Sequence, residues 1–348
     1  MRKLVTVREI TAIEPIVSAD RIEEVWVDGW SVVCQKGIHR IGDLVLYFEL
    51  DSFLPESDKR FESFMKFGTR TFDGVLGHRI KTVRLKGTYS QGIIMPIREF
   101  PEIVNPEKEV DYSEAIGVVK WELPETSGYQ GDQKGTFPCF LQKSDQERIQ
   151  NLYGKLSNAH HNEEFVGTLK MDGSSITVFY VDNSYSDQGF GICSRNQELK
   201  YDPELSFDEQ GNFIKGALNS DLFNKAKELH DIYGGYYAIQ GELVGAGIQG
   251  NFEKFDTYQV FAYNIFDIEK QSFVNYEMFE EMADSVALQC VPVVYEPQCV
   301  LREQLADILQ LSNVVGLKAE YAEGIVWKQL NGNCQFKAIS NKYLEKQK

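Results

Sequence analysis

The stretch that decides the interpretation of this chain is Lys170-Met171-Asp172-Gly173-Ser174-Ser175. It lies between two apolar segments rich in β-forming residues, 165–169 and 176–180, which are typical of strands. Gly173 has no Cβ and permits a tight turn, and Asp172 places a carboxylate near the amine of Lys170. The pattern predicts a loop that presents a nucleophilic lysine to a phosphate. The alternative is an exposed lysine in a hairpin turn.

Further charged and aromatic side chains follow this loop at the ends of candidate strands. They are Arg195, Glu242, Tyr263, Glu323, Lys328 and Lys337. Each has an ordinary structural alternative: a surface salt bridge for the arginine, solvent-facing strand ends for the carboxylates and lysines, and a core position for the aromatic residue. The order of the whole set over about 170 residues favours one shared site over chance.

This set resembles the covalent nucleotidyltransferase superfamily of DNA ligases, RNA ligases and mRNA-capping guanylyltransferases. The matching segments are Lys170 to Ser174 (motif I), Arg195 (Ia), Glu242 (III), Tyr263 to Asp267 (IIIa), Glu323 to Lys328 (IV) and Lys337 (V). The aromatic motif has Tyr263 where phenylalanine is common in the family, and a tyrosine should still stack on adenine.

The order of domains resembles one branch of this superfamily, the Naegleria-type or fifth RNA ligase family. DNA ligases and capping enzymes carry an OB domain after motif V, whereas 11 residues follow Lys337 here and a β-rich segment comes first. This order argues against both a DNA-sealing and a capping enzyme. Other stretches similar to that family are Val27-Asp28-Gly29-Trp30, 47–53, Ser90-Gln91-Gly92, 144–151 and 337–346.

The resemblance implies an ATP-dependent RNA ligase that joins 3′-OH and 5′-phosphate RNA ends through lysyl-AMP and RNA-adenylate intermediates, in RNA repair. ATP and Mg²⁺ (or Mn²⁺) are the implied cofactors. It implies Lys170, Lys337, Asp172, Glu242 and Glu323 as catalytic residues, with Asp172 and Glu323 holding the metal largely through water. The implied nucleotide contacts are Lys170, Arg195, Glu242, Tyr263, Lys328, Lys337 and Arg148.

The fold class that we expect is α+β. Alternating apolar residues predict short strands at 4–10, 23–27, 31–35, 44–49, 80–85 and 92–96, which favours an OB-like β-barrel. Residues 55–78 are expected to form a long loop or a short helix, and 101–137 a linker leading into the second domain. The predicted domains are 1–118, OB-like, and 119–348, an adenylyltransferase domain with ATP-grasp-like antiparallel sheets. Its helices are expected at 143–156, 219–233, 276–286 and 302–311.

Composition limits the partners. A net charge of −16 argues against a general nucleic-acid binder, unless basic residues gather on one face. Arg79, Lys81, Arg84 and Lys86 form such a cluster, either as RNA contacts or as a solvated strand edge. The six scattered cysteines form no Cys-x-x-Cys pair and favour a reducing compartment. With no long apolar run and no leader pattern, we expect a cytoplasmic monomer without a membrane segment.

Two other functions stay open at this stage. One is a DNA-sealing nucleotidyltransferase. The other is a catalytically inactive scaffold that binds RNA ends, against which the presence of Lys170, Glu242, Glu323 and Lys337 together argues.

Overall fold

The computed structural model describes residues 2–17, 19–122, 133–182 and 189–346. Contacts divide the chain into two compact units. Unit 1 comprises Met1–Pro124, Ile149–Gly154 and Asn341–Lys348, and unit 2 comprises Glu125–Arg148 and Lys155–Ser340. The domain boundary that we predicted after residue 118 stays a prediction. Residues 123–132 of the expected linker lie outside the described residues.

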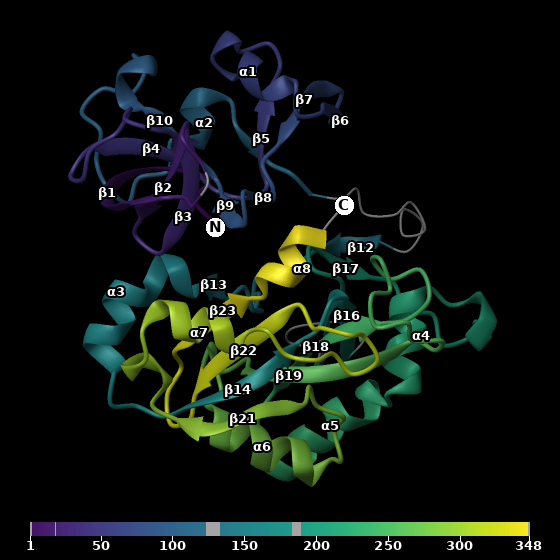
Figure 1. Ribbon diagram of the computed structural model, residues 1–348. Coiled ribbons are helices and arrows are strands. Elements are labelled where there is room, and N and C mark those ends of the chain that lie inside the picture. Colours follow the sequence, from purple (N-terminus) through teal and green to yellow (C-terminus); the bar gives the residue numbers. More distant parts are fainter. Residues whose placement is uncertain (1, 18, 123–132, 183–188, 347–348) are drawn as a thin grey trace. The chain divides into compact units, whose positions relative to one another are not determined.

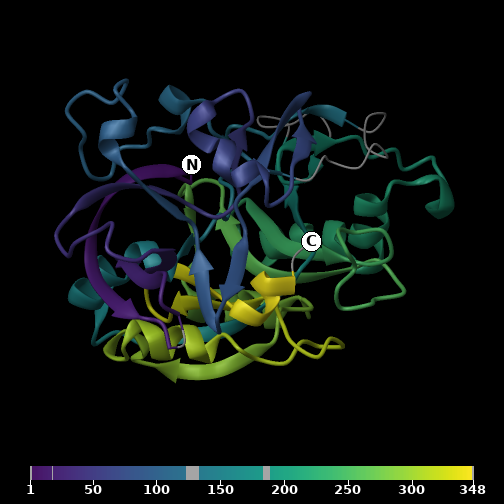
Figure 2. The same cartoon turned by 45° about the horizontal axis from the view of Figure 1, so that its top comes forward.

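Unit 1 is built from antiparallel strands. A five-stranded sheet has the order β10-β4-β1-β2-β3, with bounds Ile93–Pro96, Leu44–Phe48, Val5–Pro15, Ile22–Val27 and Trp30–Gln35. The long strand β1 pairs with β4 through its first half and with β2 through its second half, and the purple arc in Figure 2 shows its curvature. These five strands match five of the predicted segments: burial alternates along β2, and β3, β4 and β10 each carry a run of buried residues, so apolar side chains mark all of them in the sequence.

Residues 55–78 differ from the expected loop or short helix, because they also contribute strands. A second sheet has the order β11-β5-β7-β6, with bounds Val119–Lys120, Ser52–Pro55, Val75–Arg79 and Arg70–Phe72. Hairpin β8-β9 follows (Thr82–Leu85, Thr88–Gln91). The unit's short helices are η1 Lys59–Phe61, α1 Glu62–Met65, η2 Ile97–Glu99, α2 Ser113–Ile116 and α8 Asn341–Lys346. The apolar pattern in the sequence did not predict strands β6 and β7, because most of β6 and the first two residues of β7 are exposed.

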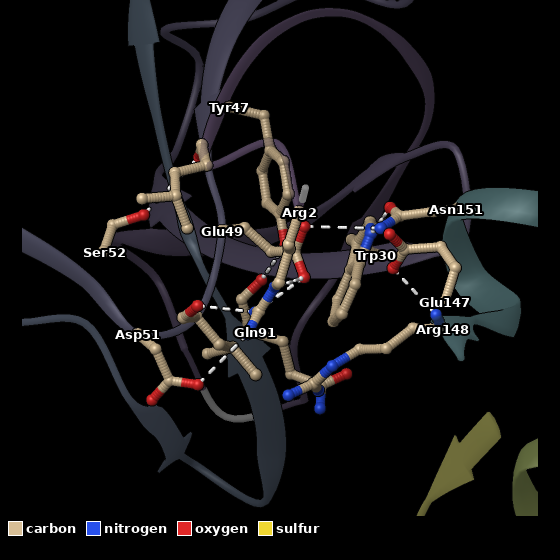
Figure 3. Close-up of polar contacts among 12 residues, drawn as sticks. Arg2, Trp30, Tyr47, Glu49, Asp51, Ser52, Gln91, Glu147, Arg148 and Asn151 are labelled. Carbon is tan, nitrogen blue, oxygen red and sulfur yellow. Dashed lines mark hydrogen bonds and ion pairs between the residues drawn. The ribbon is translucent and has the colours of Figure 1, made fainter. Parts of the chain in front are cut away.

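A buried polar network lies inside unit 1 (Figure 3). Arg2 donates to the fully buried carboxylate of Glu49 at 2.7 Å and pairs with Asp51 at 3.3 Å. Asn151 in the first turns of helix α3 accepts from the indole of Trp30 at 2.7 Å and donates to Glu49 at 3.3 Å. These bonds explain why residues 149–154 group with unit 1.

Unit 2 contains two sheets. The larger has the order β12-β17-β16-β15-β18-β19-β20, with bounds Gln133–Thr136, Gln197–Leu199, Phe190–Cys193, Ser174–Tyr180, Tyr237–Val244, Gln259–Asp267 and Ser272–Phe273. The smaller has the order β13-β23-β22-β14-β21, with bounds Glu147–Arg148, Gln335–Ile339, Gly324–Gln329, Phe165–Lys170 and Val293–Gln298. Both predicted strands around Lys170 are confirmed, and each belongs to a different sheet.

Helices of unit 2 pack on one face of the larger sheet (Figure 1). Helices α4, α5 and α6 span Asn212–Asn219, Leu222–Tyr233 and Tyr276–Ser285, and their apolar side chains join Ile176, Val178 and Ile239 in the main core. Further helices are η4 Phe207–Glu209, η5 Val300–Arg302 and α7 Leu305–Leu311. The helix predicted from 219 begins at Leu222, because Asp221 takes a left-handed conformation that separates α4 from α5.

Helix α3 runs from Ile149 to His160 and begins later than predicted. The predicted first turn, from Lys143, is not helical, because Glu147 and Arg148 form strand β13 beside Phe336 and Lys337. The helix predicted from 302 begins at Leu305. None of the helices in the described ranges is both long and apolar enough to cross a membrane.

Candidate active site

The loop that holds Lys170 connects the two sheets of unit 2. Lys170 is the last residue of β14 in the smaller sheet, and β15 of the larger sheet begins at Ser174. Met171, only 2% exposed, packs with Leu169 and Phe261 in a small apolar cluster. Because the Met171 side chain is buried in this cluster, its neighbours Lys170 and Asp172 are held in place at the crossing of the sheets, the point where the chain passes from the smaller sheet to the larger one.

Carboxylates gather around the Lys170 amine. Its Nζ lies 2.7 Å from the Glu323 carboxylate, at the start of β22. Glu242 enters from β18, opposite Ser175 of β15, and accepts a hydrogen bond from the backbone N–H of Gly173. The half-buried site therefore combines one amine with three carboxylates, including that of Asp172.

These charges shift one another's protonation. Burial acts to lower the pKa of Lys170, but the carboxylates of Glu323, Glu242 and Asp172 outweigh it and raise that pKa above its ordinary value. Burial raises the pKa of Glu242 to about 8, against the opposing effect of the Lys170 charge. Lys170 is thus an ion-paired ammonium here, and it must leave Glu323 and lose a proton before it can act as a nucleophile.

Gly173 is required by close packing behind the loop. A Cβ at this position would lie 2.4 Å from the Leu243 carbonyl oxygen and 2.9 Å from Cγ of Glu242. We expect Gly173→Ala to displace both Asp172 and Glu242 and to slow transfer of a nucleotide to Lys170 about 100-fold, since misplacement by about 1 Å costs this much. The measurement is the single-turnover rate of label transfer from α-labelled ATP.

Gly135→Ala is the matched control for this substitution. A Cβ at Gly135 in β12 meets nothing within 4 Å, so the control should keep the wild-type rate. A Gly173→Ala protein that reacts as fast as the control would show that the packing behind the loop does not position the site.

Lys337, Arg148 and Lys328 share one face of the smaller sheet with Lys170. Across the strands, Lys170 is paired with Gly324, and Lys337 lies between Val326 of β22 and Arg148 of β13. Cross-strand partners point to the same face, as do residues two apart along a strand. The sheet therefore brings the basic side chains expected from the sequence to the side that carries Lys170.

The amine of Lys328 has protein partners in place of solvent. Its side chain is buried, and Nζ donates to the backbone carbonyl of Tyr263 and, at 3.1 Å, to Oδ1 of Asn264. The rings of Tyr263, Tyr276 and Phe279 surround it with centroids at 5.8, 5.9 and 5.0 Å. This position gives Lys328 a role in supporting strand β19, and its predicted phosphate contact stays a prediction.

Burial lowers the pKa of Lys328 to about 7. The unfolded chain, where this amine titrates near its ordinary value, therefore binds more protons between about pH 7 and pH 10, and the folded state gains stability as the pH rises through that window. Relative to Lys328→Met, the wild-type free energy of unfolding should increase by about 2 kcal/mol from pH 7 to pH 9. Denaturant unfolding at the two pH values tests this, with the exposed Lys200→Met as control; a difference that does not change with pH would contradict it.

Tyr263 occupies an irregularity in strand β19. Gly241 pairs with Ala262 and Gln240 with Asn264, so that Tyr263 is the extra residue of a β-bulge. Bulges redirect a side chain, and they are common beside active sites. Its hydroxyl lies 3.1 Å from both Ser175 and Ser144, which fixes the orientation of the ring.

Arg195 lies in the turn between β16 and β17. Its guanidinium forms an exposed ion pair with Asp145 at 3.0 Å, which is the surface salt bridge that the sequence left open as an alternative. Nothing in this contact prevents the side chain from reaching a nucleotide, and its nucleotide contact stays a prediction.

The donor set at the loop suits a hard divalent cation. Asp172 and Glu323, the two residues expected to hold the metal, offer only carboxylate oxygens, the ligands that Mg²⁺ and Mn²⁺ prefer. In the described part of the chain, no three His, Cys, Asp or Glu side chains converge closely enough to hold a metal by themselves. Mg²⁺ commonly keeps several waters when one or two carboxylates bind it.

Comparison with known proteins agrees with this geometry. An RNA ligase family model matches residues 163–344, and an OB-fold domain model matches residues 4–97. The structure of a Naegleria gruberi RNA ligase variant without ligand is 33% identical, with a TM-score of 0.89, and the match covers 99% of this chain and 98% of that one. The chain belongs to the RNA ligase family.

Other solved structures of the Naegleria gruberi RNA ligase are similar over the same length. A variant with ATP and Mn matches with 33% identity and a TM-score of 0.89, and the enzyme with pyrophosphate with 33% and 0.88; each match covers 99% of both chains. No curated protein matches the sequence. The predicted family, the N-terminal OB fold and the α+β nucleotidyltransferase fold of this RNA ligase are thereby confirmed.

Several site residues of the ligase were not found from the sequence. Ser144 and Ser175 hold the Tyr263 hydroxyl, and Asn264 holds Lys328. Gly324 has a φ of 155°, and a Cβ there would lie 2.2 Å from the Ala338 carbonyl oxygen. The one available signal was position, since Ser175 follows the Lys170 loop directly and Asn264 follows Tyr263.

Proposed function

We propose that this RNA ligase uses ATP to join RNA 3′-OH and 5′-phosphate ends through a lysyl-AMP and an RNA-adenylate. The observation that carries the proposal is the Lys170 amine at the crossing of two sheets, 2.7 Å from Glu323 and close to Glu242 and Asp172. In this setting Lys170 can act as a nucleophile once substrate binding separates its amine from Glu323 and the amine loses a proton.

In the first step, Nζ of Lys170 attacks the α-phosphate of ATP. An N–P bond forms, the bond to the β-phosphate oxygen breaks, and pyrophosphate and the amine proton leave. Tyr263 stacks on adenine, and Glu242 accepts a hydrogen bond from a ribose hydroxyl. Lys337, on the same sheet face as Lys170, attracts the negative charge of the phosphates.

Asp172 and Glu323 are the residues that would hold a divalent cation, mostly through water. A bound Mg²⁺ or Mn²⁺ would neutralise charge at the α-phosphate. Glu323 has a second role in this proposal, because it pairs with the amine until the reaction begins.

The second and third steps use the same site. An RNA 5′-phosphate oxygen attacks the AMP phosphorus, the N–P bond breaks, and Lys170 recovers a proton. An RNA 3′-OH then attacks the 5′-phosphate of the RNA-adenylate, AMP leaves, and the hydroxyl proton is released. Lys337 and Arg148, neighbours in register, would hold the phosphates during these exchanges.

Nucleotide and metal dependence test the first step. With α-labelled ATP and Mg²⁺, the protein should become covalently labelled. GTP in place of ATP should label it at least about tenfold less, because a site that hydrogen-bonds the edge of adenine leaves those groups unpaired against guanine. Excess EDTA should abolish labelling, and Mn²⁺ should restore it. Equal labelling with GTP, or labelling in EDTA, would contradict the proposal.

A substrate panel separates this function from its alternatives. Matched nicked duplexes with RNA or DNA strands at the nick would be incubated with ATP and Mg²⁺, and the joined strand measured. Sealing of the RNA nick in preference to the DNA nick supports the proposal. Preference for DNA would favour a DNA-sealing enzyme, and binding of RNA ends without label transfer would favour an inactive scaffold.

A further inference from the structure

One face of the sheet β11-β5-β7-β6 in unit 1 carries both aromatic rings and cations. Phe53 of β5 lies opposite Arg79 of β7, and Arg70 of β6 lies opposite Gly77. Phe72 lies opposite Val75, two residues before Gly77. Since cross-strand partners and alternate residues point the same way, these side chains share a face. We call it the Trp121 face, defined by Phe53, Phe72, Trp121, Arg70 and Arg79, and we include Lys81, which lies two positions after Arg79 and within reach of the charges of Arg70 and Arg79.

The aromatic residues form a contiguous cluster. Ring centroids lie 5.1 Å apart for Phe72 and Trp121, 5.7 Å for Phe53 and Trp121, and 5.6 Å for Phe53 and Phe72. Gly77 makes room for it, because a Cβ there would lie 2.7 Å from the Phe53 ring. Phe53 is buried, whereas Phe72 and Trp121 are half-buried and keep part of their rings accessible.

The cations surround the same indole. The guanidinium groups of Arg70 and Arg79 each lie 5.8 Å from the Trp121 ring centroid. Arg79 pairs with Asp51 at 2.7 Å, but neither Arg70 nor Lys81 forms an ion pair with any residue of the described ranges. Burial lowers the pKa of Lys81, the nearby charges of Arg70 and Arg79 add to the effect, and the carboxylate of Asp51 opposes it. The group thus holds excess positive charge within a protein of net charge −16.

We propose that the Trp121 face binds a single-stranded segment of the RNA substrate, with phosphates on Arg70 and Lys81 and a base stacked on Trp121. The inference rests on the proposed function, because it assigns a surface to that RNA. Interleaved aromatic and basic side chains are the combination by which single strands are bound. A protein with a large net negative charge needs such a local positive field to attract a polyanion.

A neighbouring groove limits where the phosphates lie. The groove, of about 880 Å³, shares Phe53 and Phe72 with the Trp121 face. Four carboxylates (Asp58, Asp73, Glu99 and Glu102) and two cations (Lys59 and Arg60) line it, and Arg60 pairs with Asp58 and Glu102. The lining keeps an excess of carboxylates, which would repel an RNA backbone. The strand is therefore held on the Arg70 and Lys81 side of the rings.

The cations Arg84 and Lys86 lie in the hairpin β8-β9, which forms a sheet separate from β11-β5-β7-β6. Arg84 donates to the Gly87 carbonyl and lies over Tyr89, at 5.2 Å from its ring centroid. The structure thus separates the four basic residues expected as RNA contacts into two groups, and the inference assigns RNA to Arg79 and Lys81 together with Arg70 and Trp121.

The test measures binding of a fluorescein-labelled 12-nucleotide RNA to full-length protein by anisotropy, without ATP, over a range of salt concentrations. The double variant Arg70→Ala/Lys81→Ala is compared with Arg84→Ala/Lys86→Ala and with a matched control, Lys36→Ala/Arg40→Ala, which removes two exposed cations elsewhere in unit 1. Trp121→Ala and Trp121→Phe separate stacking from charge. Labelling of each variant by α-labelled ATP reports whether it is folded and whether nucleotide binding is affected.

The expected result is that Arg70→Ala/Lys81→Ala weakens RNA binding about tenfold. The slope of log affinity against log salt concentration should fall in magnitude by about 1.4, because each of the two lost phosphate contacts contributes about 0.7. Trp121→Ala should weaken binding about tenfold and Trp121→Phe less. Both other double variants should stay within about twofold of wild type, and label transfer should be unchanged in all. Equal losses in the control, or RNA binding unaffected by Arg70→Ala/Lys81→Ala, would overturn the inference.

Two further outcomes distinguish this inference from the proposed function. If the cation variant loses label transfer but not RNA binding, the face serves the nucleotide, and the inference is wrong while the proposed function stands. If wild-type protein takes no label from ATP but binds RNA through this face, the proposed function fails and the inference survives.

Discussion

Lys170→Met should abolish covalent attachment of AMP, lowering label transfer by more than about a thousandfold. Methionine has a similar length and no amine, so the attacking atom is lost while the volume at the crossing of the two sheets is nearly kept. The measurement is a denaturing gel after incubation with α-labelled ATP and Mg²⁺, on protein treated with pyrophosphate to remove any AMP already attached. The exposed Lys200→Met is the matched control and should label like wild type.

The same variant separates chemistry from folding. An RNA that already carries a 5′-adenylate needs the third step alone, in which Lys170 forms no bond. Lys170→Met should therefore still join such an RNA to a 3′-OH strand, within about tenfold of the wild-type rate, because the groups that bind the phosphates remain. Label on the Lys170→Met protein would contradict the assignment of the nucleophile.

Glu323→Gln is expected to slow self-adenylylation about 100-fold or more, the size of effect that loss of one preorganised electrostatic group produces. The amide keeps the shape of the side chain, but it removes the charge that pairs with Lys170 at 2.7 Å and that would hold the metal. The Mg²⁺ concentration that gives half the maximal rate should be higher than in wild type, because the substitution removes one anionic oxygen donor and weakens Mg²⁺ binding.

Rates of label transfer at several Mg²⁺ concentrations test this expectation. Glu320→Gln is the control, since Glu320 lies three positions before Glu323 and is exposed. A Glu323→Gln protein with the same rate and the same Mg²⁺ dependence as the control would remove Glu323 from the site.

The sequence predicted the parts of the site that depend on local order. Lys170, Asp172 and Gly173 lie in a loop between two strands, and Glu242, Tyr263, Glu323 and Lys337 lie within or next to the strands expected for them. The strands that carry these residues were predicted because half-buried and buried strands leave a strong apolar pattern. The same pattern predicted the five strands that pair in the first sheet of unit 1. The roles of the site residues stay predictions.

Long-range pairing decided what the sequence could not show. The bulge that isolates Tyr263 depends on the register of β18 with β19, and the burial of Lys328 depends on a carbonyl and an amide 65 and 64 positions away. Strand β13 replaced a predicted helix turn because β23 was available to pair with it. Short, exposed strands such as β6 carry no alternation of apolar residues and were missed for that reason.

The same limit applies to the basic cluster in unit 1. Arg79, Lys81, Arg84 and Lys86 are close in sequence, but the last two lie in the hairpin β8-β9, which forms a sheet separate from the one that holds Arg79. Arg70 and Trp121 come from distant positions and join that face only through strand pairing and ring contacts.

The measurement that tests the central claim most directly is a pulse–chase on a nicked RNA duplex. Wild-type protein labelled with α-labelled AMP would be freed of ATP and mixed with a duplex carrying a 5′-phosphate and a 3′-OH at the nick. The account predicts that label leaves the protein, appears on the RNA 5′ end, and is released as AMP as the strand is sealed. Label that stays on the protein with intact RNA ends would contradict it.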